Sequence, residues 1–455
     1  MEQPIKSNRL GTEPIVPLLF KLAIPSILSM FIQAFYNVVD SIFVAKLSEK
    51  ALAALSLAFP IQMILIAIGV GTGIGTSSLI SRLLGSGNEK RASIAAEHVL
   101  IIAVFYGLFI GLLGILFSKY FISMFTNDPI LIDYGSRYIK IILIGSLFVF
   151  ISILCNNILR GEGNTFLPMI TMLIGSILNI ILDPLMIFGY GFFPKLGIEG
   201  AAIATVLSRA ISSTFILLML FKGKHQIKLN LKKFSFDPTI LKDIYQVGFP
   251  SMTMQFLASF MIAGLNAILG SYGSTSIAAL GIYFRLQSFV FMPVFGLNQG
   301  YMPIMGYNYG HKNPYRMKKT MKVAFFIAFT FTTLGFFMLQ LFPRELIKMF
   351  HDSPKLLEIG TDTLKTISIA FPIIGPAIIG STTFQAIGKG IPSLILSFLR
   401  QIILLLPLAF LLAKIDGLNL IWYAFPISEC IAFIWMVFWL KKTLKTVFSD
   451  MEENI

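Results

Sequence analysis

Four oxygen-bearing side chains lie in otherwise apolar stretches of this sequence, where they could bind a small cation. Asp40 lies within QAFYNVVDSIFVAKL (33–47), and Thr205 lies within GIEGAAIATVLS. Asn179 and Asp183 lie four residues apart in SILNIILDPLMIFG, so they share one face of a helix. Carboxylate, amide and hydroxyl oxygens are hard ligands, which suit Na⁺ or a proton rather than a soft metal.

The segments that position these residues are long and apolar. Of the 455 residues 56% are hydrophobic and only 13% are charged, and the mean hydropathy is +0.81. This composition is typical of an all-α polytopic membrane protein, in which each spanning helix needs about 20 apolar residues. The first window is longer than the apolar core of a signal peptide, so we expect it to stay in the membrane. The twelve expected spans are 17–44, 52–80, 92–118, 134–158, 166–190, 197–221, 242–270, 276–307, 317–343, 357–384, 392–414 and 418–441.

The second half of the sequence repeats the first. AIPSILSMF (23–31) matches GFPSMTMQF (248–256) at a shift of 225 residues. Six spans return the chain to the side from which it started, so the halves have the same orientation and are related by a pseudo-twofold axis along the membrane normal. We therefore expect two parallel six-helix bundles, 1–221 and 242–455, joined by a cytoplasmic linker, 222–241. The same shift pairs Gln62 with Gln287, Gly71 with Gly296, Gly75 with Gly300, Gly85 with Gly310, and Arg91 with Arg316.

The formal charge of +14 is explained by membrane topology and does not indicate nucleic-acid binding. Basic residues concentrate in alternate loops, which is the asymmetry that places those loops, and both termini, in the cytoplasm. The basic loops contain Arg82, Lys90 and Arg91; Lys222, Lys224, Lys228, Lys232 and Lys233; Lys312, Arg316, Lys318 and Lys319; and Lys441, Lys442 and Lys445.

The carboxylates lie where an ionised group is costly. Asp40, Asp183 and Thr205 each lie about five to seven residues, or about 8–10 Å, from the expected outer end of their spans. A proton, a bound cation or a basic partner must neutralise a carboxylate at this depth. Alternatively, Asp40 is solvated near the interface or pairs with Lys46. The 225-residue shift places Leu265 opposite Asp40, so we expect cation coupling in the first half only.

Other classes of chemistry find no support in the sequence. Cys155 and Cys430 lie in apolar segments, and the four histidines have no metal-binding spacing, so neither a disulfide framework nor a transition-metal site is expected. The run GVGTGIGTSSLI (69–80) lacks the Gly-Lys-Ser/Thr of a phosphate-binding loop and lies within an expected span. We expect no ATP hydrolysis, no enzymatic activity and no cofactor.

Several longer motifs resemble those of the multidrug and toxic compound extrusion (MATE) family, over nearly the whole chain. They are YNVVDSIFVAKL, NIILDPLMIFGYG, GIEGAAIATVLS and, in the second half, NQGYMPIMGYNYG. The first-helix acid together with NIILD resembles the branch containing DinF-like and MepA-like exporters. That resemblance implies a coupling site for H⁺ or Na⁺, with supporting residues nearby and a proline at which the first helix bends. The matching positions are Asp40, Asn179, Asp183 and Thr205 for the cation, Tyr36 and Tyr138 as supporting residues, and Pro25 as the bending point.

The resemblance also implies what such a protein does. The family fold has two bundles around a V-shaped cleft that opens alternately outward and inward. We therefore expect a monomeric antiporter in the plasma membrane that exports small lipophilic, mostly cationic drugs or dyes in exchange for H⁺ or Na⁺. The alternative is a flippase for lipid-linked precursors, in which Arg209, Arg285 and Arg400 would bind a pyrophosphate headgroup. These arginines could instead pair with acids such as Glu429 or lie nearer a membrane interface than the expected span boundaries. A structural or receptor-like protein is a third alternative, which the costly buried acids disfavour.

Overall fold

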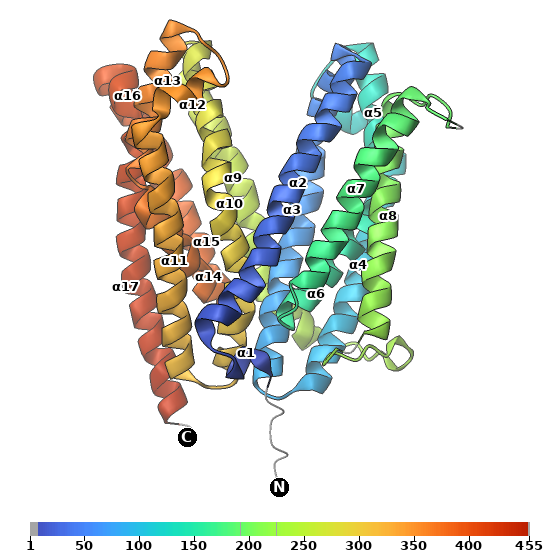
Figure 1. Cartoon of the computed structure of the whole chain (residues 1–455), viewed down its shortest axis with the longest axis vertical. Helices are drawn as coiled ribbons and strands as arrows, with labels where there is room; N and C mark the ends of the chain where they lie inside the picture. Colours follow the sequence, from blue (N-terminus) through green and yellow to red (C-terminus); the bar gives the residue numbers. More distant parts are fainter. Residues whose placement is uncertain (1–7, 192, 224, 454–455) are drawn as a thin grey trace. The chain divides into compact units, whose positions relative to one another are not determined.

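The protein is helical throughout the part that the structure describes, a computed structural model covering residues 8–191, 193–223 and 225–453. This confirms the all-α class expected from the long apolar runs. The elements are α1 (Arg9–Thr12), α2 (Ile15–Leu47), α3 (Glu49–Gly85), α4 (Glu89–Ser123), α5 (Pro129–Ile144), α6 (Ser146–Gly161), α7 (Phe166–Phe188), α8 (Ile198–Lys222), η1 (Leu231–Lys233), α9 (Pro238–Gly270), α10 (Ser274–Gly310), α11 (Pro314–Leu341), α12 (Pro343–Lys348), α13 (Pro354–Ser368), α14 (Phe371–Ala386), α15 (Gly390–Phe398), η2 (Leu399–Leu405), α16 (Leu406–Ile421) and α17 (Ala424–Glu452) (Figure 1).

Ten helices within the described residues are long and apolar enough to cross a membrane, and two bent pairs raise the number to twelve. The expected spans 134–158 and 357–384 are these pairs, α5 with α6 and α13 with α14, bent by 48° and 51°. At the first bend Gly145 lies against α8, where a Cβ atom would come within 2.3 Å of Val206 Cγ2. The bend thus coincides with a close tertiary contact that only a residue without a side chain permits, and hydropathy does not reveal such a contact.

The described residues form two compact units. One consists of Ile24–Gly248 and is called the N unit; the other, the C unit, combines Met1–Ala23 with Phe249–Ile455. The two breaks, 23/24 and 248/249, are themselves 225 residues apart, so they obey the sequence repeat.

The units differ from the contiguous halves because the first turns of α2 and α9 pack away from their own repeats. Gly300 of α10 contacts Leu22 and Ala23 at the start of α2. Correspondingly, Gly75 of α3 lies against the Ile244 carbonyl in α9. The sequence repeat predicted the bundles 1–221 and 242–455. In the structure the first turns of α2 belong to the C unit, and the first turns of α9 belong to the N unit.

The repeat also sets where helices begin. The Asn88 side chain caps α4 by accepting a hydrogen bond from the Arg91 backbone N–H at 3.1 Å. Asn313 caps α11 in the same way, accepting from the Arg316 backbone N–H at 3.0 Å. Asparagine at this position satisfies backbone donors that the helix itself leaves free.

The expected linker is held against the N unit. Glu97 of α4 accepts a hydrogen bond from the Asn230 backbone N–H at 2.6 Å, and His98 Nε2 accepts one from the Asp237 N–H at 2.8 Å. Glu162, just beyond α6, bonds to His225 at 3.0 Å. This segment is therefore an ordered strap over the ends of α4 and α6, and α9 begins at its end.

Candidate cation site

Three of the four expected cation ligands meet between α7 and α8, which pack against each other in the N unit. Asn179 Nδ2 donates to Asp183 Oδ1 at 3.3 Å and to Thr205 Oγ1 at 3.2 Å. The helical spacing of four residues produces the first contact, because it places Asn179 one turn below Asp183. Asp183 is 0% exposed and Asn179 is 2% exposed, so both groups are removed from bulk solvent.

Asp40 of α2 completes the group. Its half-buried carboxyl lies within hydrogen-bonding reach of the Asp183 carboxyl. Two buried oxygens, Asp183 Oδ2 and Asn179 Oδ1, accept no hydrogen bond from any described residue. Two ionised carboxylates this close repel each other, so the arrangement requires a shared proton or a cation between them. The oxygen-only donor set fits Na⁺ as well as H⁺.

Both tyrosines implied by the family resemblance lie beside these acids. The Tyr36 hydroxyl on α2 lies beside Thr205, and it interacts electrostatically with Asp40 and Asp183. Tyr138 of α5 is buried and interacts with Asp40 and Tyr36. The structure thus gathers four helices, α2, α5, α7 and α8, around one buried polar cluster.

Two further residues belong to this environment and were not assigned to the site from the sequence. Gln62 of α3 donates from Nε2 to the Tyr138 hydroxyl at 3.5 Å. Arg209 of α8 interacts electrostatically with Tyr36. Gln62 recurs in the repeat as Gln287, which was the only signal in the sequence that could have singled it out.

Pro25 lies away from the cluster. It is 15 residues before Asp40, or about 22 Å along α2, and it is the second residue after the break between the two units. A proline within a helix removes one backbone hydrogen bond, which permits bending. Ser29 Oγ donates to the Pro25 carbonyl at 2.8 Å. The role of Pro25 as a bending point stays a prediction.

The alternative partner for Asp40 does not fit the structure. None of the ion pairs among the described residues joins Asp40 to Lys46. Within those same residues, no cluster of three His, Cys, Asp or Glu side chains could hold a metal. The Asp40 and Asp183 pair therefore depends on the surrounding hydroxyl and amide groups, or on a small cation.

The C unit has apolar residues at the positions that correspond to Asp40 and Asp183. Leu265, opposite Asp40 in the repeat, is 1% exposed within an apolar cluster. The sequence LLPL (405–408) aligns with LDPL (182–185), which places Leu406 opposite Asp183. Leu406 packs on Gly264, directly beside Leu265. Leucines of one apolar cluster thus occupy both positions where the N unit has carboxyls.

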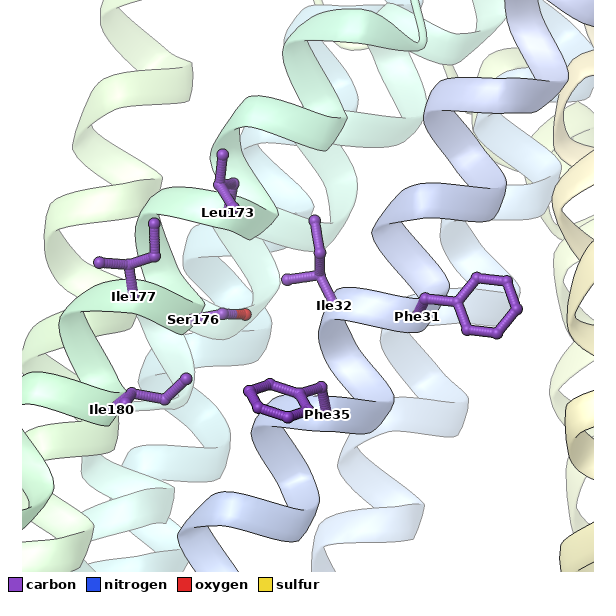
Figure 2. A pocket seen from close by; sticks show the side chains of 7 residues that line it. All are labelled: Phe31, Ile32, Phe35, Leu173, Ser176, Ile177 and Ile180. Atoms are coloured by element: carbon purple, nitrogen blue, oxygen red, sulfur yellow. The ribbon is translucent and has the colours of Figure 1, made fainter.

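An apolar pocket of about 350 Å³ lies on the same two helices as the carboxyls. Figure 2 shows Ile32 and Phe35 of α2 beside Ser176 and Ile177 of α7. Ser176 is one turn from Asn179, and Phe35 directly precedes Tyr36. A ligand in this pocket and a cation at the carboxyls would therefore act on the same helix pair. The pocket residues are Phe31, Ile32, Phe35, Leu173, Ser176, Ile177 and Ile180.

Comparisons with known proteins give consistent results over most of the chain. The family model MatE matches residues 25–185 and 250–411, and the two matches begin at the repeated prolines. A FAD transporter of Shewanella oneidensis is 30% identical over 426 residues, covering 91% of this chain and 92% of that protein. The multidrug export protein MepA of Staphylococcus aureus is 25% identical over 448 residues, covering 97% of each.

Solved structures agree with the sequence relatives. A transporter of the MOP superfamily from Pyrococcus furiosus superposes with a TM-score of 0.90 at 29% identity, covering 98% of this chain and 99% of that one. An outward-facing multidrug resistance transporter of the MATE family gives the same TM-score, identity and coverage.

Proposed function

Because the chain belongs to the MatE family, whose members are membrane transporters and not enzymes, we propose that it exports lipophilic, mostly cationic organic compounds in exchange for H⁺ or Na⁺. The protein is a multi-pass membrane protein related to multidrug exporters. Beyond this relationship, we propose the identity of the coupling ion, the charge of the substrate and the direction of exchange.

The observation that carries the proposal is the buried pair Asp40 and Asp183. Two carboxyls face each other, and Asp183 Oδ2 and Asn179 Oδ1 have no donor among the described residues. A proton or Na⁺ relieves the repulsion and draws α2 toward α7 and α8. When the cation leaves, the repulsion returns and the contact of α2 with α7 loosens. The cation thus controls how α2 packs.

Substrate binding acts on the same helix pair. The apolar pocket between α2 and α7 (Figure 2) accepts the lipophilic part of a substrate. The carboxyls of Asp40 and Asp183 on the same two helices attract its positive charge. Cation and substrate therefore favour different packings of α2, and by thermodynamic linkage each lowers the affinity of the other. Reciprocal competition of this kind is what an exchange mechanism requires.

The cellular setting follows from charge placement. Basic residues in alternate loops support an orientation in the plasma membrane with both termini in the cytoplasm. We further propose that the transporter works as a monomer. Cations then enter the site from outside, where their electrochemical potential is higher, and the substrate leaves in the opposite direction.

Phosphate-bearing compounds form a second candidate class of substrate, because the Shewanella oneidensis relative is a FAD transporter and this chain carries Arg400 within a span. A flippase for lipid-linked precursors is the remaining alternative, and it would depend on Arg209, Arg285 and Arg400 rather than on the carboxyl pair. Both alternatives require recognition of an anion.

Transport of ethidium into inside-out membrane vesicles tests the proposal. Vesicles containing the wild-type protein should accumulate the dye under an imposed proton or Na⁺ gradient. Adding an ionophore for the coupling ion should abolish accumulation, while an ionophore for the other ion should leave it unchanged. Accumulation that survives collapse of both gradients would reject ion coupling.

A further inference from the structure

The C unit contains an arginine in the middle of a membrane span. Arg400 lies ten residues after Gly390 in the apolar stretch Gly390–Ile421, so it is about 15 Å from that end. Arginines at such depth almost always face a bundle interior or a water-filled cavity, because lipid does not solvate them. Arg400 also belongs to the π-helical segment η2, a geometry that occurs frequently at functional sites.

Arg400 forms an ion pair with Glu429 of α17, the acid that the sequence suggested as a partner. Arg400 Nη1 lies 2.9 Å from Glu429 Oε1 and 3.3 Å from Oε2. The Glu429 side chain is 14% exposed, and the fully buried Tyr283 of α10 interacts electrostatically with both charges. The acid is thus the buried member of the pair.

The remaining edge of the guanidinium is available. The Arg400 side chain is 30% exposed. No described residue accepts a hydrogen bond from Nε or Nη2, yet neither atom is among the buried unpaired ones, so both are accessible. This edge is the pair of donors that binds two oxygens of a carboxylate or phosphate side by side. The adjacent Gln401 is buried, and its Oε1 accepts no hydrogen bond within the described residues.

The Arg400–Glu429 ion pair does not correspond, in the sequence repeat, to the cation site of the N unit. Gly197, before α8, has φ 59° and ψ −132°, and Gly417, within α16, has φ 57° and ψ −133°, so these glycines are structurally equivalent. They align Ser208-Arg209 with Ser428-Glu429. The C unit therefore has an acid where the N unit has Arg209, and it has leucines where the N unit has its carboxyl pair.

From this geometry we propose that Arg400 binds an anionic group of a transported amphiphile through Nε and Nη2, with Glu429 as the counter-ion of the unloaded protein. The inference rests on the proposed transport function and extends its substrates to molecules that carry a phosphate or carboxylate. Two sources supply such a group: a free amphiphilic phosphate or carboxylate, and the headgroup of an anionic lipid.

Two flavins that differ only in a phosphate provide the test. Binding of riboflavin 5′-phosphate and of riboflavin to the full-length protein in a neutral detergent is followed by flavin fluorescence. Wild type should bind the phosphorylated flavin more tightly. Arg400→Lys should weaken its binding about tenfold, because lysine keeps the charge but loses the bidentate edge. Riboflavin should bind equally to both proteins.

A charge swap separates binding from a structural role. The double variant Arg400→Glu with Glu429→Arg keeps an ion pair, so its melting temperature should stay near that of wild type. Its affinity for riboflavin 5′-phosphate should nevertheless be reduced as in Arg400→Lys. Arg344→Gln, which removes an exposed arginine of α12 in the C unit, is the matched control and should bind both flavins like wild type.

A lipid arm distinguishes the two sources. Short-chain phosphatidylglycerol, compared with phosphatidylcholine, should displace riboflavin 5′-phosphate from wild type if the anion is a lipid headgroup. Equal displacement by the two lipids assigns the site to a free amphiphile.

Equal affinity of wild type for the two flavins, or a phosphate preference that Arg400→Lys retains, would overturn the inference. Ethidium accumulation in vesicles tests the proposed transport function separately. Failure of the anion-binding inference can therefore be distinguished from failure of the transport proposal.

Discussion

Replacing Asp183 by Asn should stop gradient-driven export while leaving the protein folded. Asn179 Nδ2 donates to Asp183 Oδ1 at 3.3 Å, and an amide oxygen at position 183 can accept the same hydrogen bond. The change also removes a buried carboxylate, whose ionised form costs on the order of 3 kcal/mol at membrane depth. The melting temperature should therefore equal or exceed that of wild type.

The size of the transport effect follows from the single carboxyl pair. One pair holds one proton or one Na⁺, so we take one cation to be exchanged per cycle. An ion gradient of about 100-fold provides about 2.8 kcal/mol, since each tenfold ratio corresponds to about 1.4 kcal/mol. Electroneutral exchange with a monovalent cationic substrate can thus accumulate that substrate up to about 100-fold. The variant, which lacks one carboxyl of the site, should stay near a ratio of one.

Proteoliposomes with an imposed proton or Na⁺ gradient and ethidium as substrate provide the assay. Asp416→Asn is the matched control, because this exposed acid of α16 lies in the C unit and, among the described residues, accepts a side-chain hydrogen bond only from Asn419, at 3.3 Å. It should accumulate ethidium like wild type. If well-folded Asp183→Asn protein accumulates ethidium to the wild-type ratio, the reasoning from the carboxyl pair is refuted.

Three further predictions concern packing, pH and the asymmetry of the units. Gly75→Ala should lower the melting temperature strongly, because its Cβ would lie 2.1 Å from the Ile244 carbonyl oxygen, whereas Gly281→Ala, with no atom within 4 Å, should not. A hydrogen bond to Glu162 raises the pKa of His225, so protonated His225 stabilises the folded protein. Wild type should therefore melt at a higher temperature than His225→Gln below a pH of about 6.5, and this difference should disappear as the pH rises through the raised pKa of His225. Equal melting temperatures of the two proteins at low pH would contradict this prediction. Hydrogen exchange with and without Na⁺, or at low and high pH, should change mainly in the N unit; a larger response in the C unit would be inconsistent with the apolar residues Leu265 and Leu406.

The sequence was a good guide to the fold wherever composition and periodicity decide the structure. Long apolar runs predicted helices, and the repeat at 225 residues predicted two related halves of six spans each. The caps at Asn88 and Asn313 and the breaks between the units follow the same repeat, but they were recognised only in the structure. It did not predict the bend at Gly145 or the π-helical segment η2, because neither changes the apolar composition or the helical periodicity of its span. Nor did it show that the first turns of α2 and α9 pack in the opposite units.

The candidate site shows the same division. The spacing of Asn179 and Asp183 gave their contact directly, since one helical turn separates them. Depth in the membrane placed Asp40 and Thr205 at the same level, and the structure brings all four together. Their role in cation coupling stays a prediction. Gln62 was missed because a lone amide in an apolar helix has no spacing pattern, and only the fold brings it to Tyr138.

The central claim is that Asp40 and Asp183 bind the coupling cation in competition with the substrate, and linked binding measurements test it most directly. Ethidium affinity in detergent should be measured from about pH 5 to 8 and, at fixed pH, against Na⁺, for wild type and Asp40→Asn. We expect the affinity for ethidium to fall as the coupling ion is added. We also expect a saturating concentration of ethidium to release that ion from the protein, and both effects to be absent in Asp40→Asn. If neither protons nor Na⁺ change the ethidium affinity of the wild-type protein, Asp40 is a structural acid and the coupling mechanism is wrong.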